Sequence, residues 1–181
     1  TVAWTLERLP GGSLITREVL VLDRIPFPQQ EAILAPRVMA AAFTAIDATG
    51  IGGPVSEHLA AALDETRLEG VTFTGDRKRE LFERLKKTMQ ARTVALPAAA
   101  VIRDDLGSMQ RIVSPGGTIR YAAARTADGH ADRSTALALA IHAAQRNPGA
   151  GCGAFASTRV PTGMNAHHRP ALTRFRGAWA R

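Results

Sequence analysis

Two aspartates in unlike contexts are the residues best placed to do chemistry. Asp47 ends the apolar run 40–46 and precedes a glycine-rich stretch, while Asp132 opens the alanine- and leucine-rich segment 134–144. An aspartate at the end of a strand and another at a helix start can meet at the edge of a sheet, where α/β folds bind ligands. Two carboxylates that meet repel each other unless a cation lies between them. The pattern therefore predicts a divalent-metal site.

Each aspartate also has a plainer explanation. Asp47 alone could serve as a turn residue, and Asp132 could cap its helix or pair with the helix dipole, which is worth about 0.5–2 kcal/mol. His130 could be a metal ligand, a proton shuttle or an ordinary loop histidine. Asp128 is a further loop carboxylate near the same helix start.

Other catalytic classes find less support. The loop Gly50–Gly53 lacks the Gly-Lys-Ser/Thr of a P-loop, and Val55 stands where the third glycine of a dinucleotide fingerprint belongs. The single cysteine, Cys152, lies in a glycine-rich stretch that offers nothing to activate a thiolate, and it excludes an intrachain disulfide. No Gly-x-Ser-x-Gly elbow is present.

Composition points to a polyanionic partner. The chain has 181 residues, 45% of them hydrophobic, a formal net charge of +7 and a pI near 10.9. Such a charge favours nucleic acid, although a basic protein without that partner is the alternative. No apolar run is long enough for a membrane span.

The pattern of apolar residues and turn signals predicts an α/β fold. An antiparallel hairpin over 1–8 and 13–25 leads into a helix over 29–39, which Pro36 should interrupt or end. A strand buried on both faces is expected over 40–46. Further elements are expected as strands at 69–74 and 93–96, helices at 55–63, 76–91, 98–110 and 134–144, and a hairpin over 111–114 and 118–124.

Cationic residues cluster in three places: the helix 76–91, the hairpin 111–124 and the tail. The helix carries six of them, which should point mostly outward, and 146–181 holds six arginines and no acidic residue. We expect residues 1–144 to form one domain and 145–181 an irregular Gly/Pro/Arg-rich basic tail. Candidate phosphate contacts, which position a duplex without reading its sequence, are Lys78, Arg79, Lys86, Lys87, Arg111, Arg120 and Arg133.

Four segments, taken in order and spacing, resemble the C-terminal nuclease domain of phage large terminase subunits, the DNA-packaging motor family. They are Ile46-Asp47-Ala48-Thr49-Gly50-Ile51-Gly52, then 70–74 leading into 78–81, then Asp105-Leu106, and last Gly129-His130-Ala131-Asp132-Arg133 with 136–140. The resemblance covers residues 1–144.

The resemblance implies an RNase H-like mixed sheet flanked by helices. It also implies an endonuclease that uses two Mg²⁺ or Mn²⁺ ions to cut concatemeric double-stranded DNA. Asp47 and Asp132 would be catalytic metal ligands, Asp128 a further ligand, and His130 a catalytic residue near the metal. The partners implied are an ATPase motor domain, the small terminase and the portal, in the cytoplasm of a host cell.

One departure from the family concerns its first catalytic aspartate, which lies on the first, central strand. Residues 1–6 match the second strand instead, so we expect the first strand to lie upstream of Thr1, or this piece to be catalytically incomplete. The rivals are a non-catalytic DNA-binding or motor-docking module and another RNase H-like nuclease, such as a resolvase or transposase core. A phosphate-binding α/β enzyme that uses Gly50–Gly53 is a third.

Overall fold

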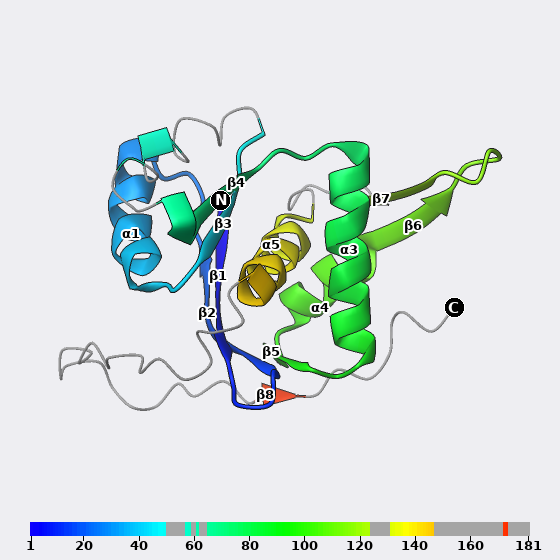
Figure 1. The fold of residues 1–181 in the computed structure, drawn as a ribbon, viewed down its shortest axis with the longest axis horizontal. Helices are drawn as coiled ribbons and strands as arrows, with labels where there is room; N and C mark the ends of the chain where they lie inside the picture. The colour runs from blue at the N-terminus through cyan, green and yellow to red at the C-terminus, as the bar shows by residue number, and fades with distance from the viewer. Residues whose placement is uncertain (50–56, 59–60, 62–64, 124–130, 147–171, 174–181) are drawn as a thin grey trace.

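The computed structural model describes residues 1–49, 57–58, 61, 65–123, 131–146 and 172–173, and these form a mixed α/β fold. The described strands make three small sheets, with the orders β1-β2-β5-β8, β3-β4 and β6-β7. Helix α1 lies on one side of β1 and β3 and helix α5 on the other, while the β6-β7 hairpin extends away from the body (Figure 1).

The chain begins with the expected hairpin. β1 (Val2–Arg8) pairs antiparallel with β2 (Leu14–Val21), and a register shift between Thr5 and Leu6 marks a bulge. The connecting turn uses Gly11 and Gly12 at positive φ, which glycine adopts without a steric penalty. β2 pairs in parallel with β5 (Val94–Pro97), which in turn pairs with β8 (Leu172–Thr173).

Helix α1 (Phe27–Ala40) runs past the proline that was expected to interrupt or end it. That expectation was wrong because tertiary contacts hold the turn after Pro36: Arg37 pairs with Glu18 on β2, and Val38 is buried. Tertiary packing here outweighs the lost backbone hydrogen bond.

The strand predicted over 40–46 is shorter and less buried than expected. β3 (Thr44–Asp47) starts late because Ala40 still belongs to α1 and the two residues after it form a bend. Each of its four residues is half-buried. It pairs in parallel with β4 (Leu68–Val71), which follows the 3₁₀ turn η1 (Glu65–Arg67). The predicted loop 50–54 and most of the helix predicted over 55–63 lie outside the described residues.

Helix α3 (Gly75–Gln90) is amphipathic as predicted. The Thr74 hydroxyl accepts a hydrogen bond from the backbone N–H of Arg77 and caps the helix start. Leu81, Phe82 and Leu85 are completely buried in the main core. The Phe82 ring stacks on Tyr121 of β7 with centroids 5.5 Å apart.

The remaining elements complete that core. They are α4 (Ala100–Ser108), the hairpin of β6 (Met109–Val113) and β7 (Ile119–Ala123), and α5 (Asp132–Arg146). α5 packs against β1, β3, α3 and α4, so its buried residues point in several directions, as expected for a central helix. None of the described helices combines the length and hydropathy that a membrane span requires.

Candidate functional site

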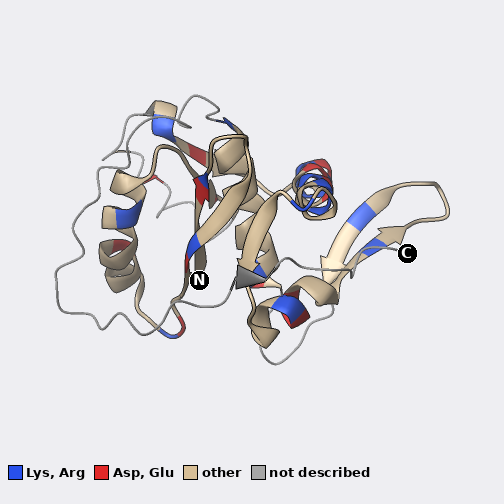
Figure 2. Ribbon diagram, turned by 90° about the horizontal axis from the view of Figure 1, so that it is seen from below, with Lys and Arg blue, Asp and Glu red and all other residues tan. Residues whose placement is uncertain are grey.

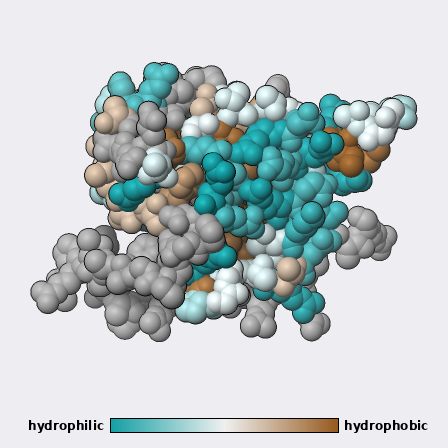
Figure 3. All heavy atoms as spheres, in the orientation of Figure 1, coloured by the Kyte–Doolittle hydropathy of each residue, from teal (hydrophilic) through white to brown (hydrophobic). Residues whose placement is uncertain are grey.

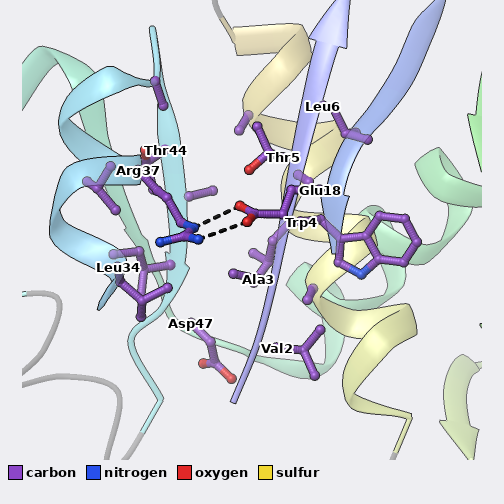
Figure 4. Close-up of a pocket in the computed structure, with 18 of the residues that line it drawn as sticks. Val2, Ala3, Trp4, Thr5, Leu6, Glu18, Leu34, Arg37, Thr44 and Asp47 are labelled. Carbon is purple, nitrogen blue, oxygen red and sulfur yellow. Dashed lines mark hydrogen bonds and ion pairs between the residues drawn. The ribbon is translucent and has the colours of Figure 1, made fainter. Parts of the chain in front are cut away.

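A cavity of about 660 Å³ lies between β1 and β3 (Figure 4). The two strands form its walls, and α1 and α5 close the other two sides. Its lining is mostly apolar, yet it includes both Asp47 and Asp132. The two aspartates singled out from the sequence therefore line one cavity, although they come from distant parts of the chain.

Asp47 is the last residue of β3. Its Oδ1 accepts a hydrogen bond from the backbone N–H of Thr49 at 2.8 Å, and the Thr49 hydroxyl accepts one from Phe73 N–H at 2.9 Å. The turn role left open by the sequence is thus present. Oδ2 has no hydrogen bond to any described residue. In Figure 4 the carboxylate lies at the Val2 end of the cavity.

Asp132 is the first residue of α5 and is exposed. The helix start is capped by a different acid, Asp105 of α4. The Asp105 carboxylate accepts hydrogen bonds from the backbone N–H groups of Ser134 (2.9 Å) and Arg133 (3.3 Å) and from the Ser134 hydroxyl. Because Asp105 supplies these acceptors, the Asp132 carboxylate is not needed as a cap. The sequence offered no signal for this role, because the two segments meet only in the folded chain.

Ala131, directly before Asp132, has left-handed backbone geometry with φ of 60° and is buried. This conformation costs a residue with a Cβ about 1–2 kcal/mol. Backbone strain of this kind is concentrated at functional sites. α5 begins at the next residue, Asp132, which lines the cavity.

An ion pair lies on the α1 side of the cavity. The Arg37 guanidinium donates to both carboxylate oxygens of Glu18, each at 2.8 Å (Figure 4). This hydrogen bonding lowers the pKa of Glu18 against the opposing effect of burial. The pair joins α1 to the β1-β2 hairpin across one side of the cavity.

A second charged network joins α5 to α3 and β4. His142 is almost fully buried; its Nε2 lies 2.9 Å from Glu69 of β4, and its Nδ1 contacts the Arg84 guanidinium. Arg77 bridges Glu69 and Glu80, at 2.7 Å from each. The α3 cations were expected to point mostly outward; Arg77 and Arg84 are exceptions, and they help to hold α3, α5 and β4 together.

Burial by itself would raise the pKa of Glu69. The hydrogen bond to His142 and the neighbouring positive charges outweigh burial and lower that pKa instead. The carboxylate is one member of a structural network that also includes His142, Arg77 and Arg146.

The predicted DNA-binding residues differ in how they are placed. Lys87, Arg79, Arg111 and Arg120 are exposed, and Lys78 and Lys86 are half-buried. Charged residues line α3 and the β6-β7 hairpin (Figure 2), and hydrophilic atoms cover the α3 face (Figure 3).

Three of the predicted DNA-binding residues have acidic neighbours: Arg79 lies 3.2 Å from Asp76, Arg111 3.6 Å from Glu83, and Arg133 3.8 Å from Asp105. Arg133 is only 20% exposed, so it is tied to the helix cap.

His130 and Asp128 lie outside the described residues, as does most of the basic tail. Within the described part of the chain, no three histidine, cysteine, aspartate or glutamate side chains form a metal-binding group. Asp47 and Asp132 therefore offer two carboxylates at one cavity, which suits a hard divalent cation in donor type and falls short in ligand number.

Comparison with known proteins adds no family to these observations. No family model matches the chain, and no curated protein or solved structure matches it either.

Proposed function

We propose that this chain is a metal-dependent nuclease domain that acts on double-stranded DNA, with an RNase H-like fold and a role in viral DNA packaging. The observation that carries the proposal is the pair of aspartates, Asp47 at a strand end and Asp132 at a helix start, on one cavity. The arrangement of an antiparallel β1-β2 hairpin, a parallel β3-β4 pair and a helix against both is compatible with that fold.

In the proposed reaction, Asp47 and Asp132 would hold divalent cations at the cavity that both of them line. Mg²⁺ or Mn²⁺ bound there would supply an activated water and neutralise charge on the phosphate that is cut. Oδ2 of Asp47 has no partner among the described residues, and Asp132 is relieved of capping by Asp105. Both side chains can therefore bind cations without breaking a described hydrogen bond. Two carboxylates alone should hold such a cation only weakly.

Phosphate contacts are proposed for the exposed cations of α3 and the hairpin. Lys87 has no ion pair with a described residue, and Arg120 has none either, so each can meet a phosphate without first leaving a carboxylate. Arg111 would give up its ion pair with Glu83 to contact a DNA phosphate. Arg133 is retained at the site only as a partner of Asp105.

Cleavage of supercoiled plasmid in Mn²⁺ tests the proposal. Asp47→Asn and Asp132→Asn should each reduce nicking by about 10²-fold or more, because each removes charge from a cation ligand. Asp104→Asn is the matched control, since Asp104 is exposed on α4 and pairs with Arg103. Equal nicking by all three variants and the parent chain would refute the proposal.

A non-catalytic DNA-binding module is the second candidate. It is favoured because no three potential metal ligands come together among the described residues, and the third carboxylate of the cavity, Glu18, is already paired with Arg37. This candidate predicts a mobility shift of duplex DNA that needs no metal and weakens when Lys87 and Arg120 are both changed to glutamine. Arg103→Gln is the control. The Asp47 and Asp132 variants would then bind like the parent and nothing would be cut.

The remaining parts of the proposal concern context. A packaging nuclease works beside an ATPase motor, a small terminase subunit and a portal in the cytoplasm of an infected cell. Co-purification of the chain with such a motor, retained by Asp47→Asn, would support the assignment to packaging. A resolvase or transposase would instead cut branched or end-specific DNA in preference to linear duplex.

A further inference from the structure

The β6-β7 hairpin has an inner face, which contacts α3, and an outer face. Residues opposite each other in its ladder share a face, and successive residues along each strand alternate between the two faces. Tyr121 and its ladder partner Arg111 belong to the inner face. The Tyr121 ring stacks on Phe82 of α3, and its hydroxyl donates a hydrogen bond to Glu83 at 2.7 Å. The outer face therefore consists of Gln110, Ile112, Arg120 and Ala122.

Two long polar side chains stand on the outer face. Gln110 and Arg120 are both exposed. Gln110 lies opposite Ala122, two residues after Arg120, so the two side chains are diagonal neighbours about 7–8 Å apart. Residues 109–123 hold two arginines and no acidic residue (Figure 2). The outer face thus presents two hydrogen-bonding groups in a region of positive charge.

The end of the hairpin is narrow and closed by hydrogen bonds. Ser114 N–H donates to the Thr118 carbonyl at 2.9 Å, and Thr118 N–H donates to the Ser114 hydroxyl at 3.1 Å. The turn itself is Pro115-Gly116-Gly117, where Gly117 adopts φ of 80°, a conformation that glycine allows. The hairpin therefore projects from the body as a pre-formed ribbon without a charged or long side chain at its tip (Figure 1).

A ribbon of this shape fits the major groove of duplex DNA. Its strands lie about 4.8 Å apart. The major groove is about 12 Å wide and admits a two-stranded ribbon, whereas the minor groove is only about 6 Å wide. Five ladder pairs give the ribbon a length of roughly 17 Å, about twice the depth of the major groove. The outer face can therefore reach base edges while the inner face stays on α3.

The two side chains of the outer face match the hydrogen-bonding groups of base edges. A guanidinium donates two parallel hydrogen bonds to O6 and N7 of guanine, and a glutamine amide both donates and accepts, as N7 and N6 of adenine require. A phosphate offers acceptors only, and an uncharged amide such as Gln110 binds it less strongly than a cation does. The diagonal spacing of about 7–8 Å corresponds to about two base steps of 3.4 Å.

We propose that the outer face of the β6-β7 hairpin reads base edges in the major groove, with Arg120 on a guanine and Gln110 on an adenine about two steps away. The inference rests on the duplex binding in the proposed function, and it gives Arg120 a base contact in place of a phosphate contact. The exposed cations of α3, such as Lys87, keep the phosphates. The protein therefore prefers some duplex sequences over others.

Selection of bound duplexes from a random-sequence pool tests the proposal, with EDTA present so that no metal-dependent cleavage occurs. The parent chain should enrich a guanine and an adenine about two steps apart, each by about fivefold or more over the other bases. Arg120→Ala should lose the guanine preference, Arg120→Gln should shift it to adenine, and Gln110→Ala should lose the adenine preference. Lys87→Gln is the matched control, because loss of a phosphate contact weakens binding to all sequences alike.

A bound pool as random as the input would overturn the proposal, whether the hairpin then met phosphates alone or another protein. Enrichment that survives when Arg120 and Gln110 are both changed to alanine would overturn it too. Plasmid nicking in Mn²⁺ is scored separately. Nicking without base preference refutes this inference and leaves the nuclease, whereas base preference without nicking does the reverse. A parent chain that binds no duplex at all would refute both.

Discussion

Asp105→Ala should destabilise the protein and loosen the start of α5. The carboxylate of Asp105 is only 10% exposed and accepts the backbone N–H groups of Arg133 and Ser134 and the Ser134 hydroxyl. Removing it takes away a helix cap, which is worth about 0.5–2 kcal/mol. It also leaves the fully buried Ser134 hydroxyl without its partner, at about 1–3 kcal/mol.

Together these effects should lower the free energy of unfolding by about 2–4 kcal/mol. Urea unfolding followed by far-UV circular dichroism measures this as a midpoint lower by about 1–2 M. Asp105→Asn should cost less, because its amide oxygen can still accept from Ser134. A loss below about 0.5 kcal/mol for Asp105→Ala, the range of an ordinary surface change, would refute the capping role.

A double-mutant cycle separates the cap from a general packing effect. In the parent chain, Ser134→Ala should cost about 1 kcal/mol, because Asp105 loses one donor. In the Asp105→Ala background the same change should be neutral or stabilising, since it removes an unpaired buried hydroxyl. Additive effects of the two substitutions would contradict a direct interaction between them.

Three other predictions follow from single contacts. The hydrogen bonds to Arg37 lower the pKa of Glu18, so the pair stabilises the fold above the unfolded glutamate pKa of about 4.3. This contribution is lost as the pH falls through the lower pKa of the folded state. Arg37→Met should therefore flatten the acid part of a plot of melting temperature against pH, and an unchanged plot would contradict this prediction. Burial and the hydrogen bond to Glu83 raise the pKa of Tyr121, the only tyrosine, to about 12, so ultraviolet titration should find it there, with Glu83→Gln bringing it nearer to its usual value; an ordinary pKa in the parent would be evidence against the buried contact. Arg92 has φ of 56° and is exposed after α3, so Arg92→Gly should raise the free energy of unfolding by about 1 kcal/mol, and a loss of stability in urea unfolding would count against the left-handed assignment.

The sequence was sufficient where local patterns decide the structure. The hairpin around Gly11 and Gly12, the amphipathic α3, the β6-β7 hairpin and the helix after Asp132 were all predicted, because turn glycines and apolar periodicity mark them. Prediction failed where contacts between distant segments decide. α1 continues past Pro36 because Arg37 meets Glu18, and Arg77 and Arg84 turn inward because His142 and Glu69 lie behind α3.

In the candidate site too, residues at element boundaries could be predicted from the sequence, and residues whose role depends on distant contacts could not. Asp47 and Asp132 could be selected from the sequence because each follows a recognisable boundary of an element, and both line the cavity. The part played by Asp105 could not be foreseen, because its partners lie on another helix. Arg133 was expected to contact DNA, and only the fold reveals the nearby carboxylate that draws it inward.

Binding of Mn²⁺ to the parent chain is the measurement that tests the central claim most directly. Paramagnetic broadening of backbone amides by Mn²⁺ reports which residues lie near the bound ion, and it does not require cleavage. Signals of Asp47 and Asp132 should broaden together at the same Mn²⁺ concentration, and Asp47→Asn should weaken the effect at both, with Asp104→Asn unchanged. Broadening at only one aspartate, or at neither, would contradict a shared metal site on this cavity.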